Sequence, residues 1–127
     1  MKSARIMGVL AGDVITLALV TLAGFATHNE LGTAGFRLLT TFIPLLLAWL
    51  LLSPHLRVYD PGYFIHPAQL WRPFWAMVLA APLAGWMRGV WLNAPIQPVF
   101  VLVLGGVSSL ALLAWRSIYW LAFARGQ

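Results

Sequence analysis

The sequence has no cysteine and few charges, with three acidic residues and 9% charged residues in all. Without cysteine there is no disulfide, no thiolate metal site and no cysteine nucleophile. The chain also has no His-Glu-x-x-His zinc helix, no Gly-x-Ser-x-Gly elbow and no glycine-rich phosphate loop. We therefore expect a protein that is not an enzyme, with no catalytic residue, no bound metal and no cofactor.

Apolar residues are what the chain has instead: they make up 61% of its 127 residues, and the mean hydropathy is +0.86. Such a composition is too apolar for a soluble fold and predicts an integral membrane protein. The apolar runs are continuous rather than alternating, so we expect helices and not a β-barrel. The sequence thus predicts an all-α fold, a single domain over 1–127 that forms a membrane four-helix bundle, with spans at about 6–27, 36–52, 74–91 and 96–119.

The net charge of +5 comes from basic residues near the ends of these spans. Lys2 and Arg5 precede the first span, Arg57 and Arg72 flank the link between the second and third, and Arg125 follows the fourth. By the positive-inside rule both termini lie in the cytoplasm. We expect a multi-pass protein of the cell's inner (plasma) membrane that contacts the lipid bilayer and binds no nucleic acid. The apolar run at the N-terminus continues well past a normal signal-peptide core, so we expect it to be retained.

The first span contains Asp13, and a charge at the middle of a bilayer costs at least about 2.5–3.5 kcal/mol. At 100° per residue Asp13 shares one face with small and polar residues, so this face should point into the bundle. Arg116 lies toward the same membrane side and is the expected partner of a buried ion pair. Three interpretations stay open: a structural clasp, a proton or ion site on Asp13, and a protonated, unpaired Asp13.

A second polar layer is expected on the other side of the membrane, formed by His28, Glu30, Arg37 and Arg88. A stripe of threonines on the first span would join the two layers, either as a hydrated path or as hydrogen-bonding contacts between helices. Metal or pigment ligation by His28 is the less favoured interpretation, because no second ligand follows three or four residues later.

The remaining polar and small residues suggest how the helices bend and pack. Pro44 and Pro82 should kink the second and third helices. Small residues should allow close helix contacts, and the candidates are Gly85, Gly89, Gly105 and Ser109. The long connection at 53–70, with Tyr59, Tyr63, Phe64 and the adjoining Trp71, should lie along the lipid headgroups.

These residues resemble a bacterial family of small four-span membrane proteins known only as a domain of unknown function, DUF3054. The resemblance covers most of the chain and rests on Gly12 with Asp13, His28, Thr41 with Phe42 and Pro44, Trp71 to Pro73, Gly85 to Arg88, Phe100, and Trp115 with Arg116. It implies a four-helix membrane fold and singles out Asp13, His28, Arg88 and Arg116, but it implies no activity.

Two hypotheses about function follow, beside a minor one of an enzyme acting on lipid. The first is an interaction module or accessory subunit that binds a partner helix or an apolar ligand such as a lipid, quinone, carotenoid or chlorophyll-type pigment. The second is a proton or small-solute transporter or channel that uses Asp13. Four helices are few for such a pathway, so this version requires a homo-oligomer.

Overall fold

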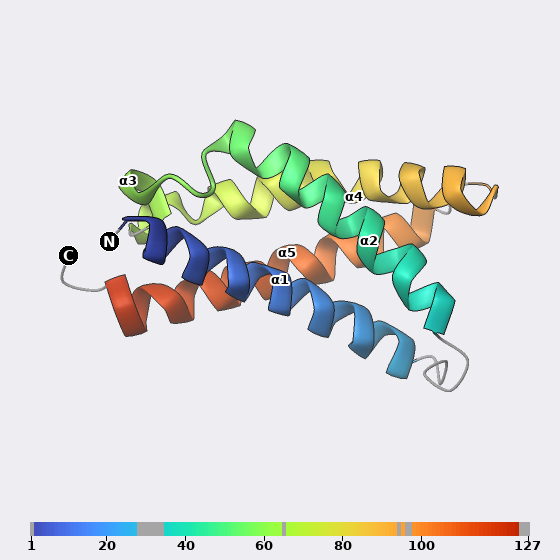
Figure 1. Ribbon diagram of the computed structural model, residues 1–127, viewed down its shortest axis with the longest axis horizontal. Coiled ribbons are helices and arrows are strands. Elements are labelled where there is room, and N and C mark those ends of the chain that lie inside the picture. Colours follow the sequence, from blue (N-terminus) through green and yellow to red (C-terminus); the bar gives the residue numbers. More distant parts are fainter. Residues whose placement is uncertain (1, 28–34, 65, 94, 96–97, 125–127) are drawn as a thin grey trace.

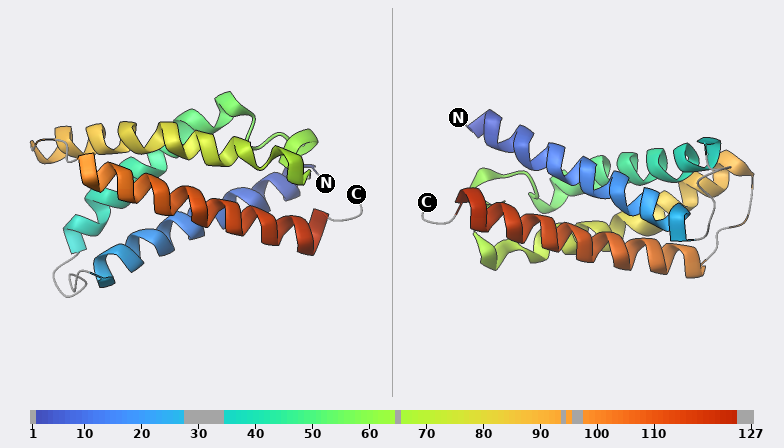
Figure 2. Two further views of the ribbon diagram at one scale, coloured as in Figure 1. Left: turned by 180° about the vertical axis from the view of Figure 1, so that it is seen from behind. Right: turned by 90° about the horizontal axis from the view of Figure 1, so that it is seen from below.

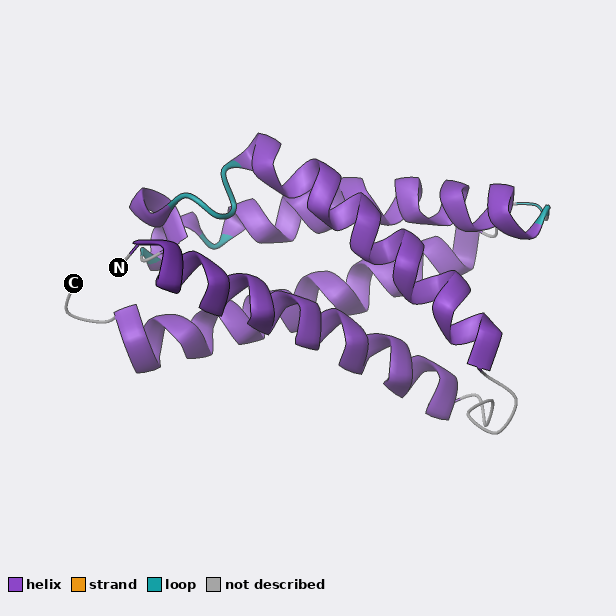
Figure 3. Cartoon of the chain, in the orientation of Figure 1, coloured by secondary structure: helices purple, strands orange, loops and turns teal. Residues whose placement is uncertain are grey.

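A computed structural model describes residues 2–27, 35–64, 66–93, 95 and 98–124, and within these ranges every regular element is helical. Figures 1 and 3 show the arrangement. The α-helices are α1 (Lys2–Thr27), α2 (Gly35–Leu52), α3 (Pro61–Phe64), α4 (Trp71–Leu92) and α5 (Pro98–Tyr119). The shorter 3-10 and π elements are η2 (Ser53–Leu56), η3 (Pro67–Gln69) and η4 (Trp120–Ala124).

The long helices α1, α2, α4 and α5 alternate in direction and lie side by side (Figures 1 and 2). Each contacts the next around a ring: α1 packs on α2, α2 on α4, α4 on α5 and α5 on α1. The start of α1, the end of α5 and the connection that contains α3 lie at one end of the structure. We call this end the loop end, because the connection 53–70 covers it.

Three of the described helices are long and apolar enough to cross a membrane: Ala4–Gly24, Leu39–Leu56 and Pro98–Phe123. They contain most of the first, second and fourth predicted spans, so the chain has the character of a membrane protein. The third predicted span, 74–91, lies in α4, which is also long at 22 residues but less apolar. Its two arginines, Arg72 and Arg88, and its tryptophans lower the hydropathy of α4, and a fourth span stays a prediction.

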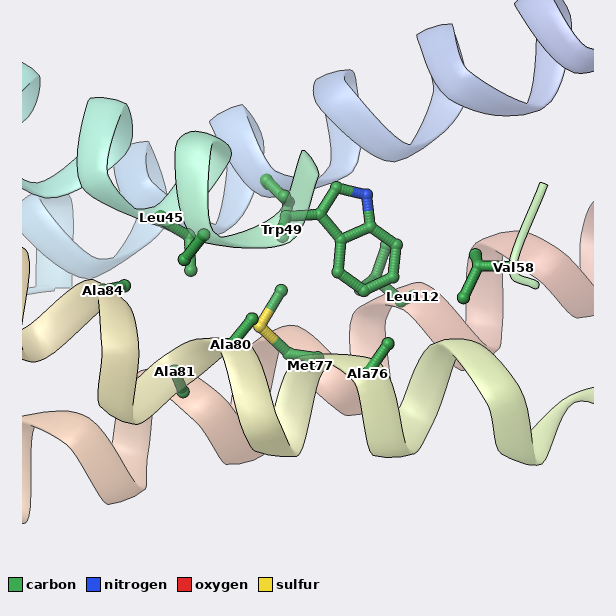
Figure 4. Packing of buried hydrophobic residues seen from close by; sticks show 11 residues of the cluster. Leu45, Trp49, Val58, Ala76, Met77, Ala80, Ala81, Ala84 and Leu112 are labelled. Atoms are coloured by element: carbon green, nitrogen blue, oxygen red, sulfur yellow. The ribbon is translucent and has the colours of Figure 1, made fainter. Parts of the chain in front are cut away.

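The distribution of side chains is that of a protein surrounded by lipid. Large apolar residues cover the outside, among them Leu102, which is 76% exposed, and Val99, which is 73% exposed. The interior instead holds alanines, hydroxyl side chains and a few large apolar residues around the fully buried Trp49. Figure 4 shows Trp49 between Leu45, Met77 and Val58, with the small side chains of α4 beneath it.

Small residues bring α4 and α5 close together, as the predicted packing positions suggested. A Cβ placed on Gly105 of α5 would lie 2.8 Å from the Cβ of Ala81 on α4. Ser109, one turn further along α5, is 1% exposed, and Gly85 on α4 is also buried. Gly89 is only partly buried, and its carbonyl accepts a hydrogen bond from the backbone N–H that caps α4.

The two predicted kink positions lie inside unbroken helical segments. Pro44 is within α2 and Pro82 is within α4, and both helices continue past the proline. Each proline removes one backbone hydrogen bond from its helix, so a bend at these residues stays a prediction.

Replacing Gly105 with alanine should separate α4 from α5, because neither Cβ in the contact can rotate away. We expect the Gly105→Ala substitution to lower the free energy of unfolding by about 1–3 kcal/mol, the usual cost of overpacking. Gly106→Ala is the matched control, since a Cβ on Gly106 meets nothing within 4 Å. Reversible unfolding in mixed micelles would measure both, and equal effects of the two substitutions would contradict the close contact.

Candidate functional site

The candidate site lies at the loop end, where α1 and α5 touch through Gly12 and Trp115. A Cβ on Gly12 would overlap the indole ring of Trp115, far inside any real contact. Only glycine therefore allows the indole to rest on the backbone of α1. Asp13 follows Gly12 and Arg116 follows Trp115, and these two residues also face each other. The Gly12–Trp115 and Asp13–Arg116 contacts therefore form one continuous contact between α1 and α5.

Asp13 and Arg116 form a buried, two-pronged ion pair. The Nε of Arg116 donates to Oδ1 of Asp13 at 2.9 Å, and a terminal guanidinium nitrogen donates to Oδ2 at 2.6 Å. Asp13 is 0% exposed and Arg116 is 3% exposed. This parallel geometry is the strongest that a guanidinium and a carboxylate adopt, and it offsets part of the cost of burying both charges.

Two groups from the connection 53–70 complete the site. The other terminal nitrogen of Arg116 donates to the backbone carbonyl of Val58 at 3.1 Å. The hydroxyl of Tyr59 donates to Oδ2 of Asp13 at 2.5 Å and accepts the indole N–H of Trp49 at 2.7 Å. The Tyr59 ring also lies under the guanidinium, 5.3 Å from its carbon to the ring centroid. Asp13 thus accepts three hydrogen bonds.

A tight turn brings these groups inward. Arg57 adopts a left-handed backbone conformation with φ of 55° and ends η2, where its N–H and that of Val58 bond to the carbonyls of Pro54 and Ser53. A residue with a side chain pays roughly 1–2 kcal/mol for this conformation. The turn reverses the chain, so that Val58 is 1% exposed and belongs to the core around Trp49.

The expectation that this connection lies along the headgroups was wrong for part of it. Tyr59 points into the site, and Phe64 is 8% exposed and packs edge-on against Tyr119 of α5, with ring centroids 6.0 Å apart. The physical reason is that the start of α1 and the end of α5 would otherwise leave Asp13 and Tyr119 uncovered at the loop end. Tyr59 covers Asp13, and Phe64 covers the ring of Tyr119. Tyr63, in contrast, is only partly buried.

Burial, and next the negative charge of Asp13, raise the pKa of the Tyr59 phenol far above its usual range. Tyr59 therefore stays protonated and keeps donating to Asp13. Because the pKa is higher in the folded state, this stabilisation is complete below the ordinary tyrosine pKa of 10.0 and declines as the pH rises above it.

The predicted outer layer is described only in part. His28 and Glu30 lie outside the described residues, and Arg37 is placed in α2 by its backbone alone. Arg88 lies on α4 with its guanidinium carbon 4.8 Å from the centroid of the Phe100 ring. Within the described part of the chain, no three histidine, aspartate or glutamate side chains gather as metal ligands.

The threonine stripe of α1 bonds to its own helix where it is described. The hydroxyl of Thr16 donates to the carbonyl of Gly12 at 2.7 Å, and that of Thr21 donates to the carbonyl of Leu17 at 2.9 Å. Such bonds one turn back leave these hydroxyls without a free proton to pass on. The stripe therefore does not connect the ion pair to the far end of the bundle through these two residues.

Reasoning from the sequence did not identify Tyr59, Trp49 or the Val58 carbonyl as parts of the site. One signal for Trp49 was available, because it lies inside its span and a buried indole N–H needs an acceptor. No local pattern gives the left-handed turn at Arg57, which decides where Val58 and Tyr59 point.

Comparison with known families gives one result. The family model described as "Protein of unknown function (DUF3054)" matches residues 10–119, and the chain therefore belongs to this family. The matched region contains the whole site, from Gly12 to Arg116. No curated protein and no solved structure matches the chain.

Removing either charge of the pair should destabilise the protein strongly, because the other charge is left buried. We expect Asp13→Ala or Arg116→Ala to lower the free energy of unfolding by about 3–5 kcal/mol each, and the double substitution to cost less than the sum. A double-mutant cycle of unfolding in mixed micelles measures this coupling. Additive losses would contradict an energetic link between the two residues.

Removing the hydroxyl of Tyr59 tests how much its hydrogen bond to Asp13 supports the ion pair. Tyr59→Phe keeps the ring under Arg116 but takes a donor from Asp13 and the acceptor from Trp49, and it should cost about 1.5–3 kcal/mol. Tyr63→Phe is the control and should change the free energy of unfolding by less than about 0.5 kcal/mol. If the two substitutions cost the same, Tyr59 does not support the ion pair.

Proposed function

We propose that this member of the DUF3054 family is a non-enzymatic interaction module or accessory subunit of the bacterial inner membrane. In this proposal α1, α2, α4 and α5 all cross the bilayer as a four-helix bundle, and both termini lie in the cytoplasm with the basic loop end. The chain would bind one transmembrane helix of a partner protein. The observation that carries the proposal is a groove between α1 and α5.

The groove has a volume of about 480 Å³. It is mostly apolar and aromatic, and α1 contributes one wall and α5 with η4 the other. The lining residues are Ala4, Arg5, Gly8, Trp115, Tyr119 and Phe123.

The small residues of α1 favour a helix as the occupant. Ala4, Gly8 and Gly12 follow each other at intervals of four, the spacing at which helices approach closely in membranes. Gly12 is covered by Trp115, whereas Gly8 is exposed and a Cβ there would meet nothing within 4 Å. Ala4 is exposed, and Phe123 is 64% exposed, so the groove is open along its length. A small ligand is usually enclosed on most sides, whereas the side chains of a neighbouring helix need an open groove.

The Asp13–Arg116 ion pair supports the walls of the groove. Trp115 and Tyr119 of the groove flank Arg116 on α5, and Arg116 is fixed to Asp13 on the opposite wall. We propose that the clasp sets the distance between the two walls, so that the groove keeps its shape without a partner. Pre-formed surfaces of this kind lose less entropy on binding.

Transport through Asp13 has less support. The carboxylate accepts three hydrogen bonds, and a carrier would have to break them in each cycle. The described threonines of α1 are bonded to their own helix, and the cavity that reaches Arg116 is only about 10 Å³, about enough for one water.

Filling the groove should release the partner. Gly8→Leu places a side chain in the open space, and we expect native mass spectrometry of gently extracted protein to show loss of a stoichiometric partner chain. Gly24→Leu is the matched control, because Gly24 is exposed on the same helix and its Cβ would also meet nothing within 4 Å. If the extracted protein instead retains a quinone or pigment, and Gly8→Leu removes it, the occupant of the groove is a small ligand and not a helix. A partner that survives Gly8→Leu would refute the groove as its site.

A further inference from the structure

Two arginines and a tyrosine at the loop end form a niche that the ion pair does not use. The guanidinium carbon of Arg72 lies 4.0 Å from the centroid of the Tyr63 ring, and that of Arg57 lies 6.0 Å from it. Arg72 also lies 4.4 Å from the ring of Trp71. Stacking on aromatic rings fixes a guanidinium in place and leaves its edge free to bind.

Hydrogen bonds position Arg72 further. Its Nε donates to the side-chain oxygen of Gln69 at 2.8 Å, and one terminal nitrogen donates to the carbonyl of Leu56 at 3.0 Å. The second terminal nitrogen makes no hydrogen bond within the described residues. The guanidinium of Arg57 makes none there either, and Arg57 is exposed. The niche therefore holds one positioned N–H donor group on Arg72 and the exposed guanidinium of Arg57, neither with an acceptor among the described residues.

The charge of the niche is of one sign. A cavity of about 10 Å³ opens between these residues, and the same cavity is lined by His66 and Arg116. None of its described lining residues is acidic. Asp60, the nearest carboxylate in the sequence, accepts the N–H of Gly62 at 2.8 Å and does not line the cavity. Arg116 is neutralised by Asp13, so the charge of Arg57 and Arg72 is left without a counter-charge in the niche.

The chemistry of these donors selects a particular acceptor. A phosphate group carries negative charge and several oxygens, which can accept from the planar fork of Arg57 and from the remaining terminal nitrogen of Arg72. The cavity itself holds no more than one water, so the group would sit at its mouth between Arg57 and Arg72. The niche adjoins the ends of two helices apolar enough to span a membrane, the level at which lipid headgroups lie.

We propose that Arg57, Arg72 and His66 form a binding site for the phosphate group of an anionic lipid headgroup. The same chemistry would accept a free phosphate anion, and the two sources are separated by experiment. This site is distinct from the α1–α5 groove, and it does not depend on a partner helix.

The test uses the full chain in a neutral detergent. Dihexanoyl phosphatidylglycerol and dihexanoyl phosphatidylcholine are titrated separately, with intrinsic tryptophan fluorescence as the readout because Trp71 contacts Arg72. We expect tighter binding of phosphatidylglycerol, and Arg57→Gln should weaken it on the order of five-fold, the effect of one basic residue near a lipid surface. Arg88→Gln is the matched control on α4 and should not change the affinity. Arg88 lies 16 residues beyond Arg72, which is about 24 Å at 1.5 Å per residue.

The outcomes divide clearly. Binding of phosphatidylglycerol that depends on Arg57 and resists competition by inorganic phosphate supports the lipid headgroup. Displacement by millimolar inorganic phosphate supports a free anion in the same niche. Equal affinities for the two lipids, or equal affinities of Arg57→Gln and Arg88→Gln, would overturn the proposal. If Arg57→Gln does not fold, His66→Gln takes its place, with His55→Gln as its control, because both histidines are exposed and only His66 lines the niche.

Discussion

The ion pair between Asp13 and Arg116 is the constraint on which the loop end depends. Two charges cannot stay in an apolar interior unless their hydrogen-bonding groups are used, and here each charge has more than one partner. This requirement explains features that would otherwise be unrelated. Gly12 allows α1 and α5 to approach closely. The strained turn at Arg57 places the carbonyl of Val58 against Arg116. Tyr59 donates to Asp13, and its hydroxyl is oriented by the indole N–H of Trp49.

The two surfaces proposed for binding both include residues next to this pair or part of it. Trp115 and Tyr119, on either side of Arg116, form a wall of the α1–α5 groove, while the segment that covers the pair continues into Arg57 and Tyr63 of the basic niche. Because the ion pair joins α1 to α5, it also holds in place the surfaces that lie next to it. The proposed interaction surfaces require the pair to stay closed, whereas transport through Asp13 would require it to open.

The parts of the fold that follow from general physical rules were predictable from the sequence. The length of the apolar runs predicted three spans that match helices long and apolar enough to cross a membrane. A charge inside an apolar span needs a partner, and this rule predicted the pair of Asp13 with Arg116. The close contact at Gly105 follows from the same reasoning about small residues. Tyr59 was not predictable, because its direction depends on one left-handed residue at Arg57 that is neither glycine nor asparagine. The predicted layer of His28 and Glu30 lies outside the described residues.

The separation of the two charges along the chain has a consequence for how the protein is made. Asp13 and Arg116 are 103 residues apart, so the first helix is synthesised long before its partner exists. Until α5 is made, the carboxylate lacks both hydrogen bonds from Arg116, and of its two side-chain partners only Tyr59 is available. A chain interrupted before α5 therefore has the carboxylate of Asp13 without the guanidinium that pairs with it in the folded structure.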